Sequence, residues 1–182
     1  PNGTLPRMLA GVALVSATLL MIELALTRIF SVVMYHHFSF LSVSLAMTGI
    51  GLGGLLVTLM PRVFRHDNLA TVGPALALAF ALAVVLAGWT AFNTPIKLAA
   101  MADNARNLVW ILVTSLVPFV LGGLVLAHIL AFNAERAHRL YFFDLLGAGL
   151  ACVLFAPLLR RLGAPAALLV AAAAGMLGGV FL

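Results

Sequence analysis

Charged residues are scarce in this chain. Of its 182 residues only 8% are Asp, Glu, Lys or Arg, and 64% are hydrophobic. A soluble domain usually carries roughly 25% charged and about 45–50% apolar residues. So few charges cannot cover the surface of a water-soluble globule. The composition therefore excludes a soluble domain and predicts an integral membrane protein.

Cysteine and basic clusters are also lacking. The single cysteine, Cys152, excludes a disulfide within the chain and a cysteine-based metal cluster. The formal net charge is +5, but the basic residues are scattered among short loops and form no stripe that would bind nucleic acid. We therefore expect the lipid bilayer to be the main partner, with no nucleic acid and no metal bound.

The chain does contain a series of apolar runs, each close to the ~20 residues that a helix needs to cross a bilayer. The runs are continuous and do not alternate every two residues, which favours helices over a membrane β-barrel. We predict an all-α, polytopic transmembrane helix bundle with about six spans. The predicted spans are residues 8–34, 38–60, 71–92, 107–132, 140–159 and 164–182.

The ends of the chain also carry information. The first residue is Pro1, and the last predicted span ends in GMLGGVFL without a polar flank. We expect residues 1–182 to be a single transmembrane module that belongs to a longer polypeptide.

Within the fourth span, Pro118 cannot donate a backbone hydrogen bond, which predicts a kink there.

Two charged residues interrupt the first span, in the stretch ELALTRIF. Glu23 and Arg28 are five positions apart, which on an ideal helix separates them by about 140°. They do not share a face, so each is expected to find partners on other helices. An ionisable group at membrane depth is a functional-site hypothesis by default. Two interpretations stay open: a structural polar cluster, and a substrate or proton site.

Histidines supply further candidates. His128 and Asp144 lie at equal distances along the chain from the loop between the fourth and fifth spans, so they could meet, and a hydrogen bond that locks this hairpin is the simpler interpretation. His36 and His37 are neighbours at the opposite membrane face and cannot sit on both sides of one haem ring. We therefore expect no haem. A single histidine can also ligate the magnesium of a chlorophyll-type pigment, but His128 alone gives weak support for one, and no cofactor is predicted.

Glycines mark the helix-packing faces. The run GIGLGG matches a dinucleotide-binding pattern, but it lies in the middle of an apolar span without the strand that such a site needs. Gly49 and Gly53 instead form a small-xxx-small face that allows another helix to approach closely, and Gly175 and Gly179 repeat this spacing in the last span. Gly147 is assigned to helix packing in the fifth span.

Two long stretches resemble one family. ELALTRIFSVVMYHHFSFLSVSLAMTGIGLGGLL (residues 23–56) and RLYFFDLLGAGLACVLFAPLLRRLGAPAALLVAAAAG (residues 139–175) are similar to the membrane segments of bacterial fused spermidine-synthase-like proteins. The resemblance implies family landmarks of unknown role at a small set of positions, namely Glu23, Thr27, Arg28, His37, Asp144 and Gly147.

The resemblance also implies a function. In that family a membrane module precedes a soluble, Rossmann-type aminopropyltransferase-like domain that carries any catalysis. These 182 residues contain no such domain, so we expect no catalytic residues and no enzymatic activity of this chain itself. The chain would be a multi-pass protein of the bacterial inner membrane, acting as an anchor or a passage for a cationic polyamine-type substrate.

The alternative function belongs to a different class. Small-residue helix faces and the lack of a catalytic constellation are also typical of a structural accessory subunit. Such a subunit would pack against other protein subunits in a larger photosynthetic or respiratory membrane complex.

Overall fold

The computed structural model describes residues 4–33, 39–61, 64, 69–94 and 101–182. It contains five long helices: α1 (Thr4–Val33), α2 (Ser39–Leu59), α3 (Leu69–Asn93), α4 (Met101–Phe132) and α5 (Ala137–Phe181). A short 3-10 turn, η3 (Ala134–Arg136), joins α4 to α5. No strand occurs within these described ranges, and the predicted all-α bundle is confirmed.

All five long helices are long and apolar enough to cross a membrane. Inside hydrocarbon no water is available to pair with backbone N–H and C=O groups, so a spanning segment must satisfy them internally. An α-helix does so within one segment, which explains why each continuous apolar run forms a helix.

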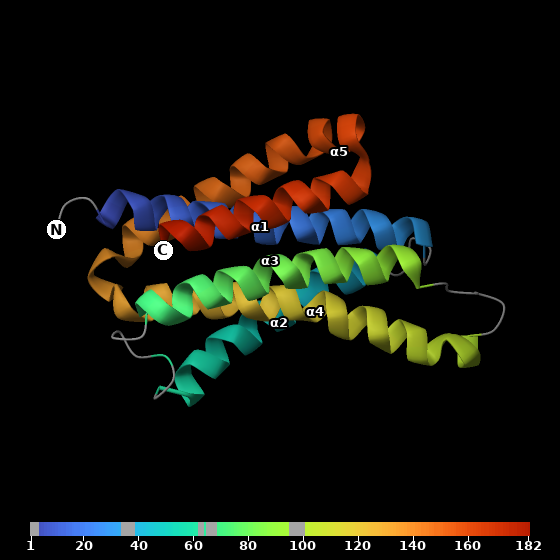
Figure 1. Cartoon of the computed structure of the whole chain (residues 1–182), viewed down its shortest axis with the longest axis horizontal. Helices are drawn as coiled ribbons and strands as arrows, with labels where there is room; N and C mark the ends of the chain where they lie inside the picture. The colour runs from blue at the N-terminus through green and yellow to red at the C-terminus, as the bar shows by residue number, and fades with distance from the viewer. Residues whose placement is uncertain (1–3, 34–38, 62–63, 65–68, 95–100) are drawn as a thin grey trace.

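Helix α5 contains the fifth and the sixth predicted spans. A straight helix of its 45 residues would be about 68 Å long, roughly twice the ~30 Å of a bilayer core. The helix is broken at Gly163, where φ is 78° and ψ is 170°. This backbone conformation is essentially restricted to glycine. The chain reverses there, and Figure 1 shows the two arms of α5 in orange and red.

The main difference from the predicted boundaries is at α4. This helix begins at Met101, well before the predicted start of the fourth span, and continues through Pro118 to Phe132. Part of the preceding connection, residues 95–100, lies outside the described residues.

The helices pack in a definite pattern. Helix α1 packs mainly on α5, α2 packs mainly on α4, and α3 packs on both α4 and α5. Gly178 in the second arm of α5 lies against Leu14 in α1, whereas Gly179 faces Ala77 in α3. The second arm therefore contacts both α1 and α3, and in Figure 1 the red arm crosses the blue helix α1.

Helix α1 supplies much of the core. Ile22, Ala25, Leu26 and Phe30 have no exposed surface, and their spacing follows one side of the helix. In contrast, large apolar side chains are exposed on α2 and on the first arm of α5, among them Phe40, Met47, Leu55, Phe142, Leu150 and Val153. Large apolar side chains on the exterior are expected of helices that are surrounded by lipid.

Candidate functional site

Glu23 lies half-buried on α1, where that helix meets α2. Its backbone carbonyl accepts a hydrogen bond of 2.7 Å from Thr27 Oγ1, one turn further along α1. The same carbonyl accepts a second hydrogen bond, 2.9 Å long, from Ser42 Oγ in α2. Thr27 therefore bonds to the backbone of Glu23 within α1, Ser42 connects α2 to α1, and neither hydroxyl engages the Glu23 carboxylate.

The Glu23 carboxylate has neither a hydrogen bond nor an ion pair within the part of the chain that the structure describes. Arg28 is exposed near the end of α1, and its backbone carbonyl accepts a hydrogen bond of 2.8 Å from Ser31 Oγ. The structure thus does not bring Glu23 and Arg28 together, as their angular separation on the helix requires.

Asp144 lies half-buried in the first arm of α5 and has its partner on α1. One of its carboxylate oxygens accepts a hydrogen bond from Ser16 Oγ, which also lies 2.9 Å from the carbonyl oxygen of Val12. The predicted partner of Asp144 was His128 on α4. The bond to Ser16 instead joins the first arm of α5 to α1, which is the helix on which α5 mainly packs.

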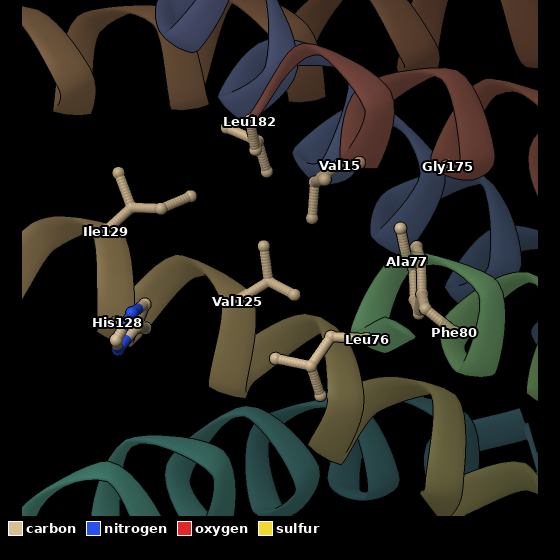
Figure 2. Close-up of a pocket in the computed structure, with 10 residues that line it drawn as sticks. Val15, Leu76, Ala77, Phe80, Val125, His128, Ile129, Gly175 and Leu182 are labelled. Carbon is tan, nitrogen blue, oxygen red and sulfur yellow. The ribbon is translucent and has the colours of Figure 1, made fainter. Parts of the chain in front are cut away.

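His128 is a buried residue of α4 that is exposed over only 4% of its surface. Its ring lies close to two aromatic rings, with centroid distances of 5.7 Å to Phe64 and 4.8 Å to Phe132. His128 also lines a small cavity of about 20 Å³ between α1, α3, α4 and α5. Figure 2 shows this cavity, whose other lining residues, such as Val125 and Ile129, are apolar. The volume suffices for about one water molecule.

The predicted polar residues therefore occupy separate places. Glu23 lies near α2, Asp144 is bonded to α1, and His128 lies among aromatic rings of its own helix and of residue 64. His37, like His36, falls outside the described residues. The polar residues that the sequence singles out are thus distributed over at least three positions in the bundle.

Several interhelical hydrogen bonds involve residues that sequence reasoning missed. Thr90 Oγ1 in α3 and Thr114 Oγ1 in α4 are 2.8 Å apart. Thr18 Oγ1 in α1 lies 3.1 Å from the carbonyl oxygen of Ala171 in α5. Isolated threonines in an apolar run carry no charge that would single them out. The available signal was the general tendency of Ser and Thr to hydrogen-bond across membrane helices.

Glycines bring pairs of helices into backbone contact. A Cβ atom at Gly53 would lie 2.5 Å from the backbone nitrogen of Leu124 in α4, and a Cβ atom at Gly49 would overlap Phe119 of the same helix. A Cβ atom at Gly147 would overlap the backbone of Ala13 in α1. The glycines at these positions thus allow α2 to contact α4, and α5 to contact α1.

The last predicted pair of glycines faces α3. A Cβ atom at Gly175 would lie 2.7 Å from the ring of Phe80, and one at Gly179 would overlap Ala77. At Gly175 the obstacle is a side chain, whereas at Gly53 and Gly147 it is backbone. This difference decides how each contact responds to substitution.

No protein-family model, curated protein or solved structure matches this chain. The resemblance to spermidine-synthase-like membrane proteins therefore stays a prediction based on the two stretches quoted above. Chemically, the described polar groups within the predicted spans offer one carboxylate, that of Glu23, that is not engaged by another described side chain.

Proposed function

We propose that this chain is the membrane module of a spermidine-synthase-like protein of the bacterial inner membrane, which anchors that protein and offers Glu23 to a cationic polyamine-type ligand. The observation that supports this proposal is the half-buried Glu23 carboxylate, which has no partner within the described residues. The proposed role is binding and passage, without catalysis by residues 1–182.

The charge of Glu23 is costly to bury in a membrane. A charged residue at the centre of a membrane span costs about 2.5–3.5 kcal/mol on insertion scales. Such a group usually pairs with an opposite charge or marks a ligand pathway. Here the nearest charged residue along the helix, Arg28, is exposed and does not pair with Glu23. A protonated amine of a polyamine would supply the missing positive charge.

The local backbone supports a fixed site. Because Ser42 of α2 donates to the carbonyl of Glu23, the α1 backbone is held against α2 at this level, and Thr27 donates to the same carbonyl from within α1. A carboxylate on a fixed backbone loses less conformational freedom when it binds a ligand than one on a mobile segment.

Glu23→Gln is expected to weaken spermidine binding by about tenfold or more, because it removes the charge and keeps the size of the side chain. Binding of radiolabelled spermidine to the purified chain in mild detergent measures the effect. Glu135→Gln is the matched control, since Glu135 is an exposed acid in η3. Equal affinity of the wild type and Glu23→Gln would contradict the proposal.

Asp144→Asn provides an internal comparison. Asp144 already accepts a hydrogen bond from Ser16, so its carboxylate is less available to a ligand than that of Glu23. Its replacement should therefore reduce spermidine binding less than Glu23→Gln does. A larger loss at Asp144 would move the proposed site from α1 to α5.

A second candidate function is that of a non-catalytic accessory subunit in a larger photosynthetic or respiratory membrane complex. Large apolar side chains remain exposed along α2 and the first arm of α5, including Phe40, Met47 and Phe142. These faces offer area on which helices of another subunit could pack, as helix interfaces in membranes require.

The accessory-subunit function predicts a stable assembly. Extraction of native membranes in a mild detergent should yield the chain in a complex much larger than its own 19.1 kDa. Size-exclusion chromatography with light scattering measures this mass. A lone monomer that still binds spermidine would reject the accessory-subunit function and keep the first proposal.

A further inference from the structure

An open apolar groove runs along the side of the bundle, between α1 and the two arms of α5. Its volume is about 680 Å³, which is within the ~300–1,000 Å³ typical of sites for small ligands. Apolar side chains of all three segments line it, among them Ala17 and Met21 from α1, Leu150 and Leu154 from the first arm, and Val170 and Ala174 from the second arm. We call this surface the α1–α5 groove.

One charged residue lines the α1–α5 groove. Arg161 is exposed and belongs to the end of the first arm, two positions before the chain reverses at Gly163. Arg160 precedes it and is also exposed, but it does not line the groove. A reversal between two membrane-spanning arms lies close to the membrane surface, where the phosphates of lipid headgroups are found. The mouth of an otherwise apolar groove thus carries a positive charge at headgroup level.

The length of the groove suits an acyl chain. Gly147 and Arg161 both line it, and this part of the first arm rises about 21 Å. One leaflet contributes about half of the ~30 Å hydrocarbon core. An acyl chain that enters the groove beside Arg161 therefore has an apolar surface along the full depth of its leaflet.

We propose that the α1–α5 groove binds an anionic glycerophospholipid, with an acyl chain along the groove and the phosphate beside Arg161. Basic residues next to grooves between membrane helices are a known way of selecting anionic headgroups. Arginine suits this role because its guanidinium donates two parallel hydrogen bonds to a phosphate.

A protein helix is the competing occupant, and the charge argues against it. No carboxylate pairs with Arg161 within the described ranges of this chain. A helix that covered the guanidinium would have to supply an acid at the same level, because an unpaired buried charge is costly. A lipid phosphate supplies that charge and remains at the membrane surface.

The test compares two matched pairs of variants in the full chain. Arg161→Gln removes the charge at the mouth of the groove, and Arg160→Gln removes a neighbouring charge outside it. Ala174→Phe fills the groove, whereas Ala173→Phe adds the same ring at an exposed position that does not line it. Binding of phosphatidylglycerol and phosphatidylcholine is measured by native mass spectrometry of the detergent-purified protein, and circular dichroism checks that each variant remains helical.

We expect the wild type to retain phosphatidylglycerol in preference to phosphatidylcholine. Arg161→Gln should weaken phosphatidylglycerol binding by about tenfold, and Arg160→Gln by clearly less. Ala174→Phe should reduce the binding of both lipids, and Ala173→Phe should leave it unchanged. Equal losses for the two arginines, or unchanged binding in Ala174→Phe, would overturn the proposal. A dimer that dissociates in Ala174→Phe, with lipid binding unchanged, would assign the groove to a second copy of the chain.

Discussion

Gly147→Leu is expected to separate α5 from α1 and to lower the free energy of unfolding by about 3 kcal/mol or more. A Cβ atom at this position would overlap the carbonyl oxygen of Ala13 and lie 2.7 Å from its Cα atom. Overpacking a well-packed core usually costs about 1–3 kcal/mol, because side chains and backbone must shift. Here the obstacle is backbone, so a change of rotamer cannot relieve the overlap and the two helices must move apart.

The matched control is Gly149→Leu, two positions further along the same helix. Gly149 is exposed, and no atom beyond the neighbouring backbone of its own helix lies within 4 Å of the position that its Cβ would occupy. This substitution should therefore change the free energy of unfolding by no more than about 0.5 kcal/mol. Unfolding of both variants by sodium dodecyl sulfate in detergent micelles, followed by circular dichroism, measures the difference. Equal destabilisation by the two substitutions would show that α5 does not contact α1 through Gly147.

The same two glycines show how far the sequence could predict the packing. The run GAG places Gly147 and Gly149 two residues apart in one apolar stretch, and composition cannot tell which of them faces a helix. Gly147 was assigned to packing, but its partner helix was not identified. The partner depends on the tilt of the first arm and on the chain reversal at Gly163, which are tertiary features.

The existence of each helix could be predicted from the sequence better than the contacts between helices. Each apolar run fixes the existence of a helix, because the bilayer requires the backbone of a spanning segment to bond within itself. The partner of Asp144 was wrongly placed on α4, because equal distances along the chain from a loop imply contact only when the two helices run straight back against each other. The structure gives Asp144 the hydroxyl of Ser16 instead.

Glu23 shows why the contact between α1 and α2 could not be predicted from the sequence. Its charge in an apolar run marked it in the sequence, yet the contact that ties this position to α2 involves its backbone carbonyl and Ser42. Backbone carbonyls are the same at every residue, so no sequence pattern shows which one will accept a bond from another helix. The hydrogen bond between Thr90 and Thr114 could not be predicted for a related reason, because both residues are uncharged and single threonines are common in apolar spans.

Gly53→Leu is the second substitution with a large expected effect, because it acts on the contact between α2 and α4. A Cβ atom at Gly53 would lie 2.5 Å from the nitrogen of Leu124 and 2.6 Å from the carbonyl carbon of Gly123. From the other side, a Cβ atom at Gly123 would lie 2.7 Å from the Cα atom of Ile50. The two backbones therefore touch over a full turn of each helix.

Because α2 and α4 meet through their backbones, shortening a side chain on α4 cannot restore the stability that Gly53→Leu removes. Gly53→Leu should lower the free energy of unfolding by about 3 kcal/mol, whereas the control Gly51→Leu, at an open and exposed position, should leave it nearly unchanged. Gly175→Ala differs from Gly53→Leu because the obstacle to its Cβ atom is a side chain, the ring of Phe80, at 2.7 Å.

Trimming that ring provides the decisive comparison. Phe80→Leu should recover part of the stability lost in Gly175→Ala, because the obstacle there is a side chain that can be shortened. The corresponding truncation on α4, Leu124→Ala, should recover none of the stability lost in Gly53→Leu, because the nitrogen that obstructs the new side chain remains. Double-mutant cycles measured by unfolding in detergent give both values. Recovery in the Gly53→Leu, Leu124→Ala double variant would mean that side chains separate α2 from α4, and the backbone contact between these helices would have to be abandoned.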